Sequence, residues 1–339
     1  PLGCSGGERS LSPPPRERRP LISSHAPPAS HLVLAKTALT AASCVALWSI
    51  EPAPLKAQDS AAAVRIHSTP APLDEGNFGW LTLETDSGIT VTGAEVAGEP
   101  LHLRRTRGGG YRAILGVPVE SGDSLAVSIR LLRAEQPESL VASVAVRPGD
   151  YPREVLTVPP AFVKPDSISA IRIQSEIAQS HEVSRHSHQR PQLWRRQFFL
   201  PRRSRITSRF GTARVYNGEV QSRHLGTDFA GAIGAPVQAA GDGIVALVAD
   251  FYLAGRAIYL DHGAGVVTAY FHLSRADVHQ GQRVRAGQRI GLVGKSGRVT
   301  GPHLHWVARY GTISVDPMSL PGVSSLGTEP ERADSAGPP

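Results

Sequence analysis

Glycine and proline divide most of this chain into short segments, which leaves little room for long helices. The 339 residues include 34 Gly and 28 Pro, and the apolar runs between them are short and rich in β-branched side chains. β-Branched residues favour strands, whereas Gly and Pro favour turns. The sequence therefore predicts an all-β protein that is long enough for two domains with separate cores.

The first of these domains is predicted over residues 62–160. Apolar residues alternate with other residues at Leu125, Val127, Ile129 and Leu131, and glycine-containing turn signals separate such runs. Period-two alternation is typical of a strand with one buried face. Several short strands at this spacing predict an N-terminal β-sandwich of the immunoglobulin-like kind.

A polar segment at residues 161–195 is predicted to be a short helical connector. Asp166 or Ser167 would provide its N-cap, and Ile168 and Ile171 would form a partial apolar stripe. The three histidines of this segment lie among Ser, Gln and Arg. These surroundings indicate a solvated surface rather than a metal site.

The two ends of the chain are predicted to lie outside the folded domains. Residues 1–57 contain an apolar stretch from Thr37 to Ile50 that has the length of a signal peptide and is too short for a well-formed transmembrane helix. Cleavage is expected near Ala57, and the residues before about position 32 are interpreted as an extension upstream of the true start. A disordered tail is expected at residues 323–339, with no stable membrane span in the mature chain.

Two short patterns in the C-terminal region contain candidate metal ligands, and they are His224-Leu225-Gly226-Thr227-Asp228 and His303-Leu304-His305-Trp306-Val307. Residues separated by an even number share one face of a strand, so His303 and His305 would lie together. His224 and Asp228 would share a face of either a helix or a strand, although Gly226 disfavours the helix. Two imidazole nitrogens and one carboxylate are a typical catalytic zinc set with a fourth position left open.

Further segments between residues 200 and 320 strengthen these two patterns. They are Thr207-Ser208-Arg209-Phe210-Gly211, Gly231-Ala232-Ile233-Gly234-Ala235-Pro236-Val237, Tyr270-Phe271-His272-Leu273-Ser274 and Gly297-Arg298-Val299-Thr300-Gly301-Pro302-His303. Together with the two patterns they closely resemble peptidase family M23, the lysostaphin-like and LytM-like peptidoglycan endopeptidases. The resemblance implies a peptidase domain over residues 196–322, built as a LytM-type antiparallel β-sheet with a duplicated, barrel-sandwich-like architecture.

The resemblance also implies a role for each histidine of the patterns. One Zn²⁺ per chain would be bound by His224, Asp228 and His305. His272 and His303 would flank the metal, where one of them would accept a proton from the attacking water and both could bond the tetrahedral intermediate. Which of the two is the base stays open.

Arg298 and Thr300 precede the second pattern and are expected to line the substrate groove. The implied reaction is hydrolysis of amide bonds in peptidoglycan cross-links or stem peptides, by a periplasmic or secreted enzyme. The formal net charge of +7 is compatible with an anionic polymer such as the cell wall. Cell-wall or divisome proteins are candidate partners, and no nucleic-acid partner is expected.

The alternative function is that of a LytM-like, non-catalytic activator of a cell-wall amidase. Such relatives usually lack one or more metal ligands, whereas this chain lacks none. Residues 281–291 also resemble biotinyl or lipoyl carrier domains, but the modified lysine is absent. Residues 291–296 match only part of a phosphate-binding loop, so nucleotide binding is disfavoured.

Overall fold

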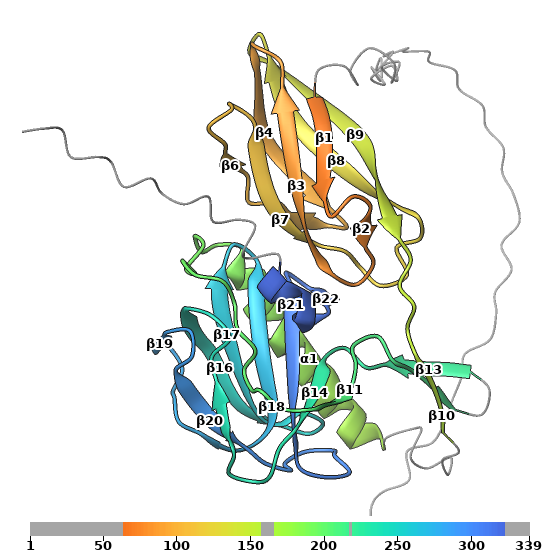
Figure 1. Ribbon diagram of the computed structural model, residues 1–339, viewed down its shortest axis with the longest axis vertical. Helices are drawn as coiled ribbons and strands as arrows, with labels where there is room; N and C mark the ends of the chain where they lie inside the picture. The colour runs from red at the N-terminus through yellow and green to blue at the C-terminus, as the bar shows by residue number, and fades with distance from the viewer. Residues whose placement is uncertain (1–63, 157–165, 217–218, 323–339) are drawn as a thin grey trace, which may run out of the picture. The chain divides into compact units, whose positions relative to one another are not determined.

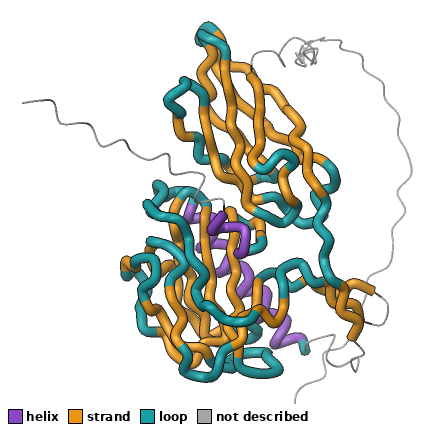
Figure 2. Tube along the Cα trace, viewed as in Figure 1, coloured by secondary structure: helices purple, strands orange, loops and turns teal. Residues whose placement is uncertain are grey.

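The computed structural model describes residues 64–156, 166–216 and 219–322 (Figure 1). Figure 2 shows that these residues are mostly strands and loops. The predicted all-β fold class is therefore confirmed. The predicted signal peptide and C-terminal tail lie outside the described residues, and no described helix is long and apolar enough to cross a membrane.

Two sheets form the N-terminal region, and side chains from both contribute to one core. The first sheet contains, in spatial order, β1 (Val64–Thr69), β3 (Phe78–Thr85), β7 (Tyr111–Gly116) and β6 (Arg104–Arg105). The second contains β2 (Leu73–Asp74), β9 (Gln136–Arg147), β8 (Ser124–Arg133), β4 (Ile89–Val96) and β5 (Glu99–Pro100). Exposed and buried residues alternate along β8, as its sequence predicts.

The C-terminal region is a ten-stranded antiparallel sheet. Its main path contains β11 (Ile206–Ser208), β14 (Thr227–Ala230), β21 (His303–Tyr310), β18 (Val266–Ala276), β17 (Gly255–Gly263), β16 (Gly243–Phe251) and β19 (Arg283–Val284). Three further strands are attached to it, namely β15 (Pro236–Gln238), β20 (Arg289–Val293) and β22 (Ile313–Val315). The 3-10 helix η2 (Pro317–Ser319) follows β22.

A separate three-stranded sheet ends directly before the first candidate ligand, His224. It contains β10 (Arg153–Leu156), β12 (Ala213–Tyr216) and β13 (Glu219–Arg223). β10 runs parallel to β12, and β12 runs antiparallel to β13. This sheet therefore brings the end of the N-terminal region beside the start of the candidate site.

Helix α1 (Ser167–Ser187) begins after Asp166, whose carboxylate caps the first turn as predicted. The predicted apolar stripe is wrong, because Ile168 and Ile171 are 82% and 69% exposed. The helix instead buries three serines, Ser180, Ser184 and Ser187, and packs against β16, β17 and β18. Small side chains allow the helix to approach the sheet closely, so this element covers the sheet and is more than a solvated connector.

Hydrogen bonds cross the core of the C-terminal sheet from β17 to β18. His262 Nδ1 donates to the Asp242 carbonyl at 2.8 Å, and the Thr268 hydroxyl donates to His262 Nε2 at 2.8 Å. The Tyr270 hydroxyl donates to Thr268 Oγ1 at 3.0 Å and accepts from the Ala240 N–H at 2.8 Å. Asp261-His262-Gly263 has the composition of a turn. His262 is nevertheless fully buried within β17, and this burial lowers its pKa to about 4.

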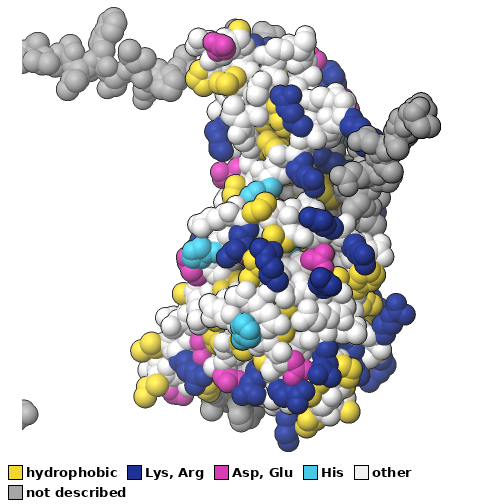
Figure 3. All heavy atoms as spheres, turned by 90° about the vertical axis from the view of Figure 1, so that its left-hand side faces the viewer, with side chains coloured by type: hydrophobic (Ala, Val, Ile, Leu, Met, Phe, Trp, Pro, Cys, Tyr) yellow, Lys and Arg dark blue, Asp and Glu magenta, His cyan; other side chains and the backbone are white. Residues whose placement is uncertain are grey.

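Figure 3 views the molecule from the side on which β16 and β19 lie in Figure 1. Lys and Arg side chains are more frequent there than Asp and Glu. This face accords with the positive formal charge of the sequence.

Candidate metal centre

The register of β14 and β21 brings two candidate ligands together. Asp228 lies opposite His305, and Ala230 lies opposite His303. His305 Nδ1 is 2.7 Å from Asp228 Oδ1, and His303 Nε2 is 3.7 Å from the same oxygen. Both imidazoles therefore lie on one face of the sheet, as their even spacing predicts.

His224 reaches this carboxylate from a loop between β13 and β14, so it lies in neither the helix nor the strand considered from the sequence. Its Nε2 is 3.1 Å from Asp228 Oδ1 and 3.0 Å from His305 Nδ1. A Cβ atom at Gly226, in the same loop, would lie 2.6 Å from His305 Nε2. A side chain at position 226 would therefore collide with the His305 ring, and only glycine fits there.

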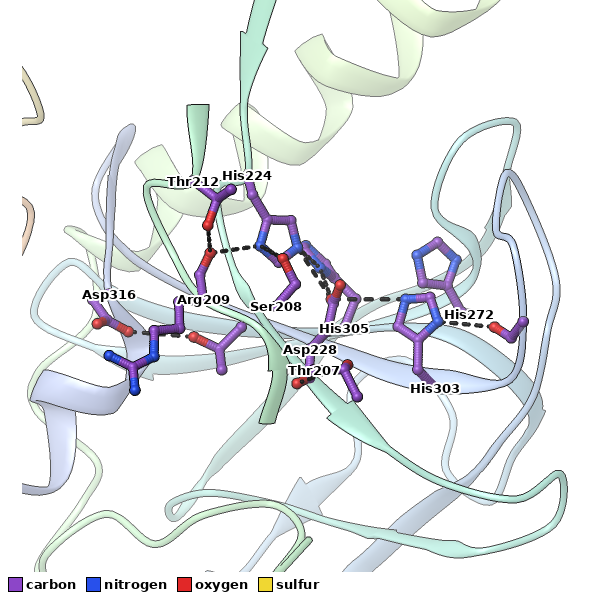
Figure 4. Close-up of polar contacts among 12 residues, drawn as sticks. Thr207, Ser208, Arg209, Thr212, His224, Asp228, His272, His303, His305 and Asp316 are labelled. Atoms are coloured by element: carbon purple, nitrogen blue, oxygen red, sulfur yellow. Dashed lines mark hydrogen bonds and ion pairs between the residues drawn. The ribbon is translucent and has the colours of Figure 1, made fainter. Parts of the chain in front are cut away.

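Three donor atoms converge at this point, and their chemistry suits a divalent metal (Figure 4). His224 Nδ1 donates to the Arg209 carbonyl at 2.9 Å, so its Nε2 directs a lone pair toward Asp228. Zinc–ligand bonds of about 2.0–2.1 Å in a tetrahedral site separate the donor atoms by roughly 3.3 Å. The observed separations of 2.7, 3.0 and 3.1 Å would have to widen by only about 0.2–0.6 Å. The residues fit a metal, and its ligation by His224, Asp228 and His305 stays a prediction.

The Asp228 carboxylate is 8% exposed and remains anionic. Burial alone would raise the pKa of Asp228. The close approach of the His224 and His305 imidazoles outweighs burial and holds this pKa far below its usual value. Burial also lowers the pKa of His305, which favours the neutral imidazole that a metal requires.

His272 is aimed into the site by a β-bulge in β18. The pairing of β18 with β17 shifts between Arg256 and Ile258, and His272 has a left-handed φ of 61°. Its Nδ1 donates to the Ser296 carbonyl at 2.9 Å, which leaves Nε2 without a proton. The centroid of the His272 ring lies 4.8 Å from that of His303. A non-glycine residue in this conformation is strained, which is common at functional sites.

The His303 ring is oriented by a backbone carbonyl, as the His272 ring is. Its Nδ1 donates to the Gly301 carbonyl at 2.9 Å, so its Nε2 is also available. Burial, followed by the neighbouring His305, lowers the pKa of His272 to about 4. Figure 4 shows both imidazoles on the side of Asp228 away from His224, so both can accept a proton beside the candidate metal centre.

A groove of about 630 Å³ opens beside the cluster and includes Asp228 and His303 in its lining. Thr300 lines this groove, whereas Arg298 is exposed and is absent from the described lining. Contact of either residue with a substrate stays a prediction.

The sequence did not single out the backbone groups that orient the imidazoles. The carbonyls of Arg209 and Gly301 belong to the segments that resemble peptidase family M23. Those segments could therefore have pointed to these two carbonyls. The carbonyl of Ser296 belongs to the glycine-rich residues that had resembled part of a phosphate-binding loop. In the structure this turn orients His272.

Comparison with known proteins places the site within one family. Residues 222–317 match the sequence pattern of peptidase family M23. The peptidoglycan DD-endopeptidase ShyA of Vibrio cholerae is 42% identical over 127 residues, which are 36% of this chain and 29% of that protein. The DD-carboxypeptidase/endopeptidase Mpg of Neisseria gonorrhoeae is 40% identical over 117 residues, which are 34% of this chain and 27% of that protein. The match therefore spans less than a third of the length of these relatives.

A solved structure from Pseudomonas aeruginosa, assigned to peptidase M23, extends the similarity beyond the site. It is 27% identical with a TM-score of 0.56, over 74% of this chain and 96% of that chain. The shared fold, the matched segment and the relatives agree that residues 222–317 are similar to peptidase family M23.

Proposed function

We propose that the chain is a zinc-dependent endopeptidase that hydrolyses amide bonds in peptidoglycan cross-links or stem peptides. The observation that carries this proposal is the convergence of His224, Asp228 and His305 beside two imidazoles with unprotonated Nε2 atoms. The names of ShyA and Mpg support the substrate class. Because peptidoglycan lies outside the cytoplasmic membrane, the enzyme would act in the periplasm or after secretion.

The proposed zinc set is His224 Nε2, Asp228 Oδ1 and His305 Nδ1. Two imidazoles and one carboxylate leave a coordination position open, as in other catalytic zinc sites. A zinc ion in this set supplies Lewis acidity toward the scissile carbonyl and its developing negative charge. The Arg209 carbonyl orients His224 through Nδ1, which fixes the tautomer that the zinc set needs.

His272 and His303 are the proposed proton-transfer groups. One of them accepts a proton from the attacking water through Nε2, while the water oxygen bonds to the scissile carbon. The imidazolium then donates this proton to the leaving nitrogen as the C–N bond breaks, which yields a carboxylate and an amine. The bonds to the Ser296 and Gly301 carbonyls keep both rings oriented during this transfer.

Digestion of purified peptidoglycan, with products identified by mass spectrometry, tests the proposal. The wild-type chain with zinc is expected to release fragments with new amino and carboxyl termini. His305→Ala is expected to lose zinc and activity together. His279→Ala removes an exposed histidine outside the groove and should retain both.

His272→Ala and His303→Ala then separate proton transfer from metal binding. The variant that lacks the base should retain zinc and lose roughly 10²–10⁴-fold in kcat. Zinc-loaded wild-type protein that releases nothing from any type of wall would refute the enzyme. Stimulation of a cell-wall amidase by that inactive protein would then support the activator function.

A further inference from the structure

The groove beside the candidate metal centre has positively charged walls. Arg153, Arg205 and Arg209 line it and are exposed. Within the described part of the chain, none of these three side chains forms a salt bridge or a hydrogen bond. The acidic residues in the lining are Glu154 and Asp228, and Asp228 already bonds two imidazoles.

Strand β11 sets the positions of two of these arginines. Arg205 and Arg209 are exposed at the two ends of β11, whose pairing with β14 shifts at a bulge between Ile206 and Ser208. The Arg205 carbonyl accepts from the Ala230 N–H at 2.9 Å, and Ala230 is the strand partner of His303. Arg205 therefore lies two strands from His303, roughly 10 Å between Cα atoms. This distance suits a guanidinium that holds one substrate group while the imidazole acts on the neighbouring bond.

Arg209 lies at the opposite end of the groove, where its carbonyl bonds His224. Figure 4 shows its side chain extending toward Asp316 and away from His303. Its charge is thus partly compensated. Arg205 is the exposed guanidinium at the end of the groove where the proton-transfer imidazoles lie.

We infer that Arg205 binds a free carboxylate of the substrate next to the scissile amide, with Arg153 adding positive charge from the three-stranded sheet. A guanidinium matches a carboxylate with two parallel hydrogen bonds, a geometry that a neutral carboxamide cannot reproduce. The enzyme would therefore prefer stem peptides with a free carboxyl group over the same peptides with a carboxamide. This inference rests on the proposed function and names the feature of the substrate that the groove selects.

The test uses two synthetic cross-linked peptide dimers that share one scissile amide. One has free carboxyl groups beside that bond, and the other has carboxamides. For the wild-type protein, kcat/KM is expected to be about five- to tenfold higher for the free acid, since an exposed ion pair contributes modestly. The bond to Arg205 exists in the ground state and in the transition state, so the preference should lie mainly in KM.

Matched variants assign the preference to one residue. Arg205→Gln should raise KM for the free acid to the value for the carboxamide, with kcat nearly unchanged, and Arg205→Lys should recover part of the preference. Arg203→Gln removes an exposed arginine two residues away that lines a different cavity, and it should leave both substrates unaffected. Equal cleavage of both dimers by the wild type, or an equal loss on both in Arg205→Gln, would overturn the inference.

A binding measurement separates this inference from the proposed function. Fluorescence anisotropy of the two labelled dimers with metal-free protein reports recognition without hydrolysis. Preference for the free acid that disappears in Arg205→Gln supports the carboxylate site, even if the zinc-loaded protein cleaves neither dimer. Hydrolysis of both dimers without any binding preference leaves the proposed function in place and refutes the site.

Discussion

Replacement of His262 should remove a large part of the acid sensitivity of the C-terminal domain. The side chain is fully buried and neutral, with its Nδ1 proton on the Asp242 carbonyl and its Nε2 accepting from Thr268. Above pH 6.5 the imidazole is neutral in the folded and the unfolded chain. Between pH 6.5 and about 4, the unfolded chain binds a proton that the folded chain excludes. The free energy of unfolding must therefore fall as the pH falls through this window, and the loss ends near pH 4.

The magnitude follows from the displacement of the His262 pKa. A change from the ordinary value of 6.5 to about 4 corresponds to about 3 kcal/mol at the rate of 1.36 kcal/mol per pH unit. Full burial means that solvent screening does not reduce this figure. Since whole domains are stable by about 5–15 kcal/mol, this one imidazole would remove a substantial part of that stability in mild acid.

Urea unfolding of the metal-free wild type and of His262→Gln, between pH 4 and 8, measures the effect. Trp194 and Trp306 are buried in this region and provide the fluorescence signal. Glutamine can donate and accept but cannot titrate, and the other histidines contribute equally to both proteins. The wild type should lose about 3 kcal/mol more than the variant between pH 7 and pH 4. If the free energy of unfolding depends on pH in the same way in both proteins, the reasoning is refuted. His262→Asn provides a second comparison if His262→Gln does not fold.

Two further substitutions test packing at the site and beneath the helix. Gly226→Ala should weaken zinc binding about 10- to 100-fold in chelator competition, because its methyl group would displace His305. Gly108→Ala, whose added Cβ would lie no closer than 4.0 Å to a neighbouring atom, should not alter zinc binding. Equal zinc affinity in both variants would contradict the tight fit. Ser184→Leu should lower the free energy of unfolding by about 1–3 kcal/mol because α1 packs closely there, while Ile168→Ser on the exposed face should change it by under about 0.5 kcal/mol. A larger effect at Ile168 in urea unfolding would show that the sequence-predicted apolar stripe is used after all.

Local patterns predicted the elements of this fold where side-chain direction depends on the backbone alone. Alternation in β8 fixed one buried face, the cap at Asp166 marked the start of α1, and the even spacing of His303 and His305 placed both on one face. These features are local because a strand or a helical turn sets the direction of each side chain from its immediate neighbours.

The same patterns failed where packing between distant segments decides the outcome. Ile168 appeared to mark a buried stripe, but the sheet accepts α1 only along its serines. His262 appeared to lie in a turn, but pairing along β17 places it in the core. Neither result could be read locally, because burial depends on which surface covers a residue.

The sequence by itself determined that this chain is a β-protein with a segment similar to peptidase family M23, and which side chains could form a metal centre. Only the tertiary structure decided that His305 and Asp228, 77 residues apart, meet at 2.7 Å, and that a bulge turns His272 toward them. It also decided that Arg205 lies at the end of the groove beside His303. The physical reason is that strand register and desolvation are set by long-range pairing, whereas residue type and spacing are properties of the chain alone.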